Sequence, residues 1–177
     1  MNGEELELLK EFYRESFELL EVFESNLVSV LNEGPSSEKI NAIFRAIHTI
    51  KGVSSMLKLD DIAEFTHILE NHLDDIRKNK FPLTNDFIGE LLICEDHLAK
   101  SIQWVMEHQN VHLPKDFQEM GQEILDSVNQ CVKKLNPQKT ECQPEKLNLS
   151  SNNNFIICFT CQGITLSERI DPYFLLQ

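Results

Sequence analysis

The sequence predicts an all-α protein, an antiparallel bundle of four helices with a fifth helix, and two observations support this class. Five segments within residues 1–135 carry apolar side chains every three to four positions, the spacing of a helix with one buried face. The breaks between these segments are short and contain residues that end or cap helices. Amphipathic helices joined by short loops pack most simply as an antiparallel bundle.

The first predicted helix spans about residues 4–31 and stops at Gly34 and Pro35. The second follows the cap residues Ser36 and Ser37 and ends near residue 57. The residues expected on their buried faces are Leu9, Phe12, Tyr13, Leu20, Phe23, Leu27 and Leu31 in the first, and Ile40, Ile43, Ala46, Ile47, Ile50, Val53 and Leu57 in the second.

The third predicted helix begins near residue 60, where Glu64 stands three residues after Asp61 as in a capping box. It ends in the basic stretch 77–80, because cations suit a helix C-terminus. Its expected buried face consists of Ile62, Phe65, Leu69, Leu73 and Ile76.

The fourth predicted helix is capped by Thr84, and the fifth follows Pro114. Cys94 and Cys131 fall on their apolar faces and are expected to be buried and inert. The other residues expected on these faces are Phe87, Leu91, Leu98, Ile102 and Val105 in the fourth, and Phe117, Met120, Ile124, Val128, Val132 and Leu135 in the fifth.

The chain changes character after the bundle of residues 1–135. Residues 136–154 are polar with two prolines, which is typical of a linker. Residues 155–177 open with FIICFTC, a β-branched and aromatic run that predicts a strand. We expect residues 155–177 to begin a second domain whose remainder is missing.

Charge and composition exclude several functional classes. The formal net charge of −13 should repel nucleic acid and anionic lipid. No run approaches the roughly 20 apolar residues that cross a bilayer, and the N-terminus is acidic, so we expect a cytoplasmic protein without membrane insertion. Five scattered cysteines do not form a disulfide framework, and Cys158 and Cys161 are half a zinc site or, more simply, two reduced strand cysteines.

A helical wheel places His48 nearly opposite the apolar arc of the second predicted helix, beside Arg45, Lys51 and Gly52. A glycine inside a helix costs about 1 kcal/mol relative to alanine. On a solvent-exposed face, no close packing requires a glycine that would explain this cost. Gly52 therefore leaves room for a bulky ligand or for the active site of a partner protein.

An exposed imidazole is a nucleophile when one ring nitrogen donates its proton to an acceptor and the other keeps its lone pair. Glu70, at the edge of the third helix's apolar stripe, is a suitable acceptor, and His67 shares its flank. Lys51 would place a positive charge near a phosphoryl group on His48. Together these residues predict a phosphoryl-acceptor site.

Other interpretations of the same residues remain open. An exposed histidine is more often an ordinary surface residue, and a glutamate at a stripe edge is usually solvated or paired. A di-metal carboxylate bundle needs two ExxH pairs, and only Glu64 to His67 fits that pattern. A structural helical adaptor would leave Gly52 unexplained.

The run NAIFRAIHTIKGVSSML, residues 41–57, resembles the phosphoacceptor helix of histidine phosphotransfer (HPt) domains, most closely that of CheA-type chemotaxis kinases. Their pattern is close to NxIFRxxHxIKGxxxxxG. The resemblance includes EFYRESFELLEVFESNL and THILENHLDDIRKNKFPLT and covers residues 8 to about 135. The segment 155–177 also looks like the start of the part that follows this domain in many such kinases.

The resemblance implies a role for each matched residue. His48 matches the phosphorylated histidine, Lys51 and Gly52 match the Lys-Gly that follows it, and Glu70, with His67 one turn before, matches the carboxylate that binds the imidazole. Two positions depart from the pattern: Val53 stands where the family often has Gly, Ser or Ala, and Lys58 where it often has Gly.

The implied reaction involves partner domains. His48 would take the γ-phosphoryl group of ATP at Nε2 from a separate kinase catalytic domain and pass it to an aspartate of a response regulator. ATP and Mg²⁺ would belong to those partners, and this chain would hold no cofactor or metal. A freestanding phosphorelay protein is the alternative with the same chemistry.

Overall fold

A computed structural model describes residues 3–135, 159–160 and 163–164 of the chain. The chain divides into two compact units, Met1–Thr140 and Glu141–Gln177. In the second unit, β1 (Phe159–Thr160) pairs antiparallel with β2 (Gly163–Ile164). β1 falls within the predicted strand, whereas the linker, Cys158, Cys161 and most of the expected second domain lie outside the described residues.

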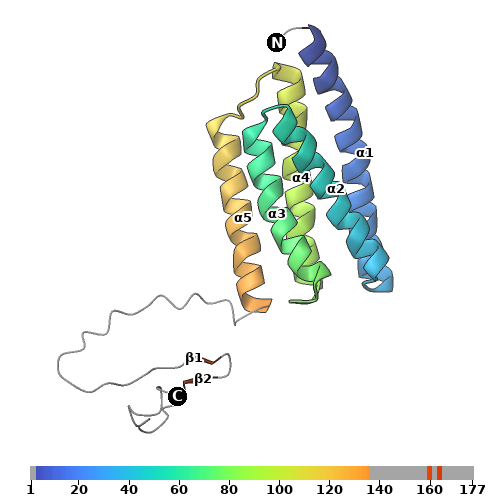
Figure 1. Ribbon diagram of the computed structural model, residues 1–177, viewed down its shortest axis with the longest axis vertical. Coiled ribbons are helices and arrows are strands. Elements are labelled where there is room, and N and C mark those ends of the chain that lie inside the picture. The colour runs from blue at the N-terminus through green and yellow to red at the C-terminus, as the bar shows by residue number, and fades with distance from the viewer. Residues whose placement is uncertain (1–2, 136–158, 161–162, 165–177) are drawn as a thin grey trace, which may run out of the picture. The chain divides into compact units, whose positions relative to one another are not determined.

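The first unit contains five helices, as predicted. They are α1 (Gly3–Glu33), α2 (Ser37–Met56), α3 (Asp60–Arg77), α4 (Asn85–His108) and α5 (Lys115–Leu135). Consecutive helices run antiparallel, and α5 flanks the bundle next to α3 and α4 (Figure 1). The all-α class and the four-helix bundle with an added fifth helix are confirmed.

Two of the predicted helix caps are present and one prediction is wrong. Ser36 Oγ accepts a hydrogen bond from the Lys39 amide, and Thr84 Oγ1 accepts one from the Phe87 amide. The capping box of α3 does not form, because the residue before α3 is Leu59 and no side chain caps the helix. Asp61 instead accepts a hydrogen bond from the Leu113 amide at 2.8 Å, which ties the connection between α4 and α5 to α3.

The turn from α2 to α3 explains why glycine suits position 58. Lys58 has a φ of 58°, in the left-handed region where a side chain is disfavoured. The amide of Leu59 donates to the carbonyl of Ser54 at 2.9 Å, and that of Lys58 donates to the carbonyl of Ser55 at 3.2 Å. Leu59 is buried beneath this turn. Lys58 therefore adopts the helix-ending conformation that glycine would adopt at lower cost.

Most residues of the predicted buried faces are buried, some are half-buried, and two are exposed. The half-buried ones, which pack against the core, are Tyr13, Ile40, Val53, Leu57, Phe117, Ile124 and Leu135. Leu31 and Met120 are 42% and 53% exposed. On α1 the spacing of Phe23 and Leu27 continues to Val30, which is buried, so Leu31 lies one position off the face. On α5, Val128 and Val132 are buried as predicted, and the other buried positions are Gly121 and Leu125.

The two bundle cysteines differ in their burial. Cys94 is fully buried, and this burial raises the pKa of its thiol to about 12, so the thiol stays protonated and inert. Cys131 is only half-buried, which is less than predicted, although its pKa is also raised by burial.

Candidate functional site

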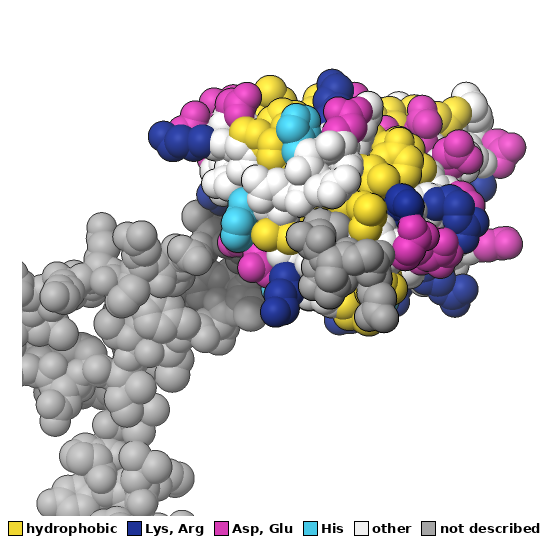
Figure 2. All heavy atoms as spheres, turned by 90° about the horizontal axis from the view of Figure 1, so that it is seen from above, with side chains coloured by type: hydrophobic (Ala, Val, Ile, Leu, Met, Phe, Trp, Pro, Cys, Tyr) yellow, Lys and Arg dark blue, Asp and Glu magenta, His cyan; other side chains and the backbone are white. Residues whose placement is uncertain are grey.

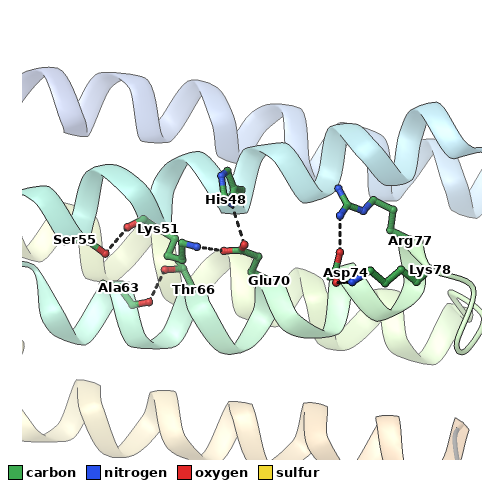
Figure 3. Close-up of polar contacts among 9 residues, drawn as sticks. All are labelled: His48, Lys51, Ser55, Ala63, Thr66, Glu70, Asp74, Arg77 and Lys78. Carbon is green, nitrogen blue, oxygen red and sulfur yellow. Dashed lines mark hydrogen bonds and ion pairs between the residues drawn. The ribbon is translucent and has the colours of Figure 1, made fainter.

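The antiparallel packing of α2 against α3 brings three of the predicted site residues together. His48 and Lys51 lie one turn apart on the same side of α2, and Glu70 reaches them from α3 (Figure 3). Residues three apart on a helix share a face, so one carboxylate can meet both side chains. The site therefore lies on the outer edge of the α2–α3 seam.

Glu70 binds one nitrogen of the His48 ring. Nδ1 of His48 lies 2.9 Å from Oε1 of Glu70, and the two side chains are 57% and 14% exposed. A carboxylate can only accept, so the Nδ1 atom carries the shared proton. In the neutral ring, Nε2 then keeps its lone pair.

Lys51 completes a row of three charged or polar groups. Its Nζ atom lies 2.7 Å from Oε2 of Glu70, so the two oxygens of this carboxylate face different partners. Burial alone would raise the pKa of Glu70, but the hydrogen bonds from Lys51 and His48 outweigh it and the pKa is lowered. The carboxylate is therefore ionised near neutral pH and able to hold the Nδ1 proton.

Gly52 and His67 border the site without joining this row. A Cβ atom built on Gly52 would meet nothing within 4 Å, so the surface beside His48 is open. His67 is exposed and lines a shallow hollow of about 370 Å³ with Lys51, Ser55, Ala63 and Glu64. Among the described residues, the ring of His67 has no hydrogen bond or ion pair, and the supporting role predicted for it remains a prediction.

Two contacts beside His48 were not predicted from the sequence. The ring of Phe44 stacks on that of His48, with centroids 5.7 Å apart and an angle of 16° between the planes. The guanidinium of Arg77 lies over the Phe44 ring, 4.1 Å from its centroid. The spacing of four residues between Phe44 and His48 was a usable signal, but nothing local pointed to Arg77.

One end of the bundle exposes apolar side chains, among them Leu8 and Met56, at 59% and 82%. Figure 2 looks onto this end and shows hydrophobic side chains between charged ones. A groove of about 310 Å³ lies here, lined mainly by apolar residues of α1, the turn between α2 and α3, α4 and the connection after it. Met56 is eight residues beyond His48, or about 12 Å along the axis of α2.

The part of the chain that the structure describes has neither a metal-binding cluster nor a membrane-spanning helix. No group of three or more His, Cys, Asp or Glu side chains there is close enough together to hold a metal ion. None of the five helices has an apolar stretch long enough to cross a bilayer.

Known proteins resemble the chain in the region that carries this site. The sequence profile of the Hpt domain matches residues 7–103. The chemotaxis protein CheA of Borreliella burgdorferi is 39% identical over 96 residues, 54% of this chain and 11% of that protein. CheA of Salmonella typhimurium is 36% identical over 91 residues, 51% of this chain and 14% of that protein. The chain therefore matches only a small part of these longer relatives.

Two solved structures share the fold. The phosphorylated P1 domain of CheA3 from R. sphaeroides, in complex with CheY6, superposes with a TM-score of 0.64 at 20% identity, over 71% of this chain and 98% of that domain. The histidine phosphotransfer domain of a CheA superposes with a TM-score of 0.60 at 23% identity, over 71% of this chain and 91% of that domain. At these identities the likeness shows a common fold.

Proposed function

The chain belongs to the Hpt domain family, and from this premise we propose that it is the phosphotransfer module of a chemotaxis-type histidine kinase with His48 as its phosphoacceptor. One observation carries the proposal. His48 is exposed and its Nδ1 atom is bound to an ionised carboxylate, with open space at Gly52 beside it. In the neutral ring, that arrangement keeps the proton on Nδ1 and the lone pair on Nε2 of an exposed side chain, as a nucleophile requires.

The first step is attack by Nε2 on the γ-phosphorus of ATP. An N–P bond forms while the bond from the γ-phosphorus to the oxygen that bridges it to the β-phosphate breaks, and ADP leaves with that electron pair. Nε2 carries no proton, so none has to be removed. The Nδ1 proton stays on the hydrogen bond to Glu70, which stabilises the positive charge that spreads over the ring.

The second step passes the phosphoryl group on. A carboxylate oxygen of an aspartate on a response regulator attacks the phosphorus, the N–P bond breaks, and the electron pair returns to Nε2. Neutral His48 is restored with Nδ1 still bound to Glu70. The ammonium group of Lys51 is paired with the Glu70 carboxylate. Because the four-carbon side chain of Lys51 is flexible, the ammonium group could swing from Glu70 to a phosphoryl group on His48.

The partners follow from this chemistry. A kinase catalytic domain supplies ATP and Mg²⁺, and a receiver domain supplies the aspartate. Both must bring an active site against the same histidine, which the absence of a side chain at Gly52 permits. We place these reactions in the cytoplasm, where ATP and response regulators are found.

The freestanding phosphorelay protein remains the second candidate. The resemblance to CheA favours the kinase module, because the two relatives described above are chemotaxis proteins much longer than the region they share with this chain. The phosphate donor separates the two candidates. Phosphorylation by a CheA kinase core supports the kinase module, whereas phosphorylation by a receiver domain supports the freestanding phosphorelay protein.

The test is phosphorylation of the purified chain by a CheA kinase core from its own organism with ATP and Mg²⁺. We expect an acid-labile, base-stable phosphate that His48→Gln abolishes. His112 is exposed as well and lies far along the chain in the connection between α4 and α5, so His112→Gln is the matched control and should label normally. Label that survives His48→Gln would overturn the assignment.

A further inference from the structure

The hydrogen bond to Glu70 does not by itself define the orientation of the His48 ring. A single hydrogen bond at Nδ1 leaves the ring free to tilt about the line that joins the two atoms, and 57% of this side chain is exposed to solvent. Attack on phosphorus needs the Nε2 lone pair to point at the incoming group. A second contact against the face of the ring would restrict the remaining tilt.

Phe44 makes that second contact. It lies one turn before His48 on α2, and the two rings are close to parallel, at 16° with centroids 5.7 Å apart. A ring stacked on the imidazole restricts its tilt. Phe44 is itself only half-buried, so its own position depends on what lies on its other side.

Arg77 covers Phe44 from α3. Its Cζ atom is 4.1 Å from the centroid of the Phe44 ring, a cation–π contact. Because α2 and α3 run antiparallel and Glu70 faces His48, Arg77, seven residues after Glu70, lies beyond His48 in the direction of Phe44 along the seam. The Phe44 ring thus contacts both the guanidinium and the imidazole.

Asp74 holds the guanidinium in place. Its Oδ1 atom accepts a hydrogen bond from Arg77 at 2.6 Å, and its Oδ2 atom pairs with Lys78 at 2.5 Å (Figure 3). Arg77 and Lys78 therefore share a carboxylate, carry the same charge and are neighbours in sequence. Of the two, only Arg77 is in cation–π contact with Phe44 among the described residues.

We propose that Arg77 is a positioning residue for phosphotransfer, which holds the His48 ring through Phe44 without touching the reacting atoms. This inference rests on the proposed function of His48. It predicts that the charge and the planar group of Arg77 act on the geometry of the imidazole, whereas the charge of Lys78 does not.

The experiment compares Arg77→Met, Arg77→Lys and Lys78→Met in the full chain. Two quantities are measured: the nitrogen-15 spectrum of the His48 ring in the free protein, and the initial rate of phosphorylation as a function of the concentration of this chain. We expect Arg77→Met to increase exchange broadening of the His48 ring signals and to lower kcat by roughly two- to fivefold, the factor that matches an exposed cation–π contact, with KM nearly unchanged.

The two other variants are the controls. Arg77→Lys keeps a cation over Phe44 and should recover much of the rate, and Lys78→Met removes an equal charge from the same carboxylate and should behave as wild type. Thermal unfolding of each variant checks that the bundle is intact. If Arg77→Met unfolds, Phe44→Leu provides the same test from the α2 side and should broaden the same His48 signals.

Two results would overturn the proposal. The first is that Arg77→Met has the same His48 spectrum and the same kcat as wild type. The second is that Lys78→Met lowers the rate as much as Arg77→Met does, which would mean that the net charge, and not the position of the ring, determines the rate. Failure of the proposed function can be distinguished from failure of the Arg77 proposal. In the former case wild type would not be phosphorylated, while the nitrogen-15 spectra would still report on the His48 ring.

Discussion

Two histidine and glycine pairs in this bundle put the same residue types to opposite uses. His48 and Gly52 lie on the exposed edge of α2, and a Cβ on this glycine would meet nothing within 4 Å. His97 of α4 and Gly121 of α5 lie inside the bundle, and a Cβ there would be 2.8 Å from Nε2 of His97. One glycine leaves the surface beside a histidine open, and the other lets two helices approach each other.

The surroundings of the two rings differ as well. Nδ1 of His48 is bound to the carboxylate of Glu70. His97 is 5% exposed, packs against the rings of Phe65 and Phe117 at 4.9 and 6.4 Å, and has no side-chain hydrogen bond among the described residues. Burial lowers the pKa of His97, so its ring is neutral. A histidine next to a glycine is therefore informative only when its exposure and its hydrogen-bond partner are known.

The largest expected effect concerns the carboxylate that only the exposed pair possesses. Glu70→Gln keeps the size of the side chain but replaces the charge, so Nδ1 of His48 loses its ionised acceptor. We expect the rate of phosphoryl transfer to fall by about ten- to a hundredfold, as when an orienting partner of a functional histidine is removed. Phosphorylation time courses measure the rate, and thermal unfolding shows whether the fold is kept. An unchanged rate would remove Glu70 from the site.

Gly121→Ala tests the buried pair. The added methyl group would meet Nε2 of His97 within a set of packed aromatic rings, so α5 or His97 must shift. We expect a loss of about 1–3 kcal/mol in the free energy of unfolding, the usual cost of overpacking. Gly89, on the exposed side of α4 with nothing within 4 Å of a Cβ, is the matched control. If Gly121→Ala and Gly89→Ala both stabilise the bundle in urea titrations, the close approach at Gly121 has no energetic weight.

Gly52→Ala should have the opposite outcome. Alanine at this open helical position should stabilise the bundle by up to about 1 kcal/mol, because it lowers the entropy of the unfolded chain and favours the helix. The rate of phosphorylation should nevertheless fall, since the methyl group would occupy the space that we propose for the partners. Urea titration and time courses on the same variant separate the two effects. A rate equal to that of wild type would show that partners do not need the space.

The smallest effect is the pH dependence of stability from His97. The pKa of His97 is lower in the folded than in the unfolded chain, so the unfolded chain binds a proton first as the pH falls. Stability from this group is complete above the unfolded pKa of roughly 6.5 and is lost as the pH falls below it. Urea midpoints at pH 7.5 and 5.5 should differ less in His97→Phe than in wild type. An equal difference in both proteins would assign the effect to other groups.

The fluorescence of Trp104 can follow the buried pair in these titrations. It is the only tryptophan in the chain, and its ring lies 6.4 Å from that of Phe117, which packs on His97. It also stacks on His108 with centroids 4.3 Å apart, so His108→Gln is needed to separate the response of His97 from that of His108.

Most of the fold could be predicted because it follows from local pattern. The buried faces of α2, α3 and α4 follow the helical period, and Ser36 and Thr84 cap helices through bonds to residues three positions away. The misses have one origin. Leu31 and Met120 each lie one position from a buried residue. Asp61 accepts a hydrogen bond from the distant Leu113 amide and does not cap its own helix. In each case a neighbouring element decided between local alternatives of similar energy.

The sequence by itself determined the class of the protein, the exposure of His48 and its open neighbour Gly52, because periodicity of 3.6 residues sets which side of a helix faces water. The wheel and the family resemblance also pointed to Glu70. Only the tertiary structure decided that Glu70 meets both His48 and Lys51, that Arg77 covers Phe44, and that Gly121 admits His97. These contacts depend on the rotation and axial register of one helix against another, which no local spacing specifies.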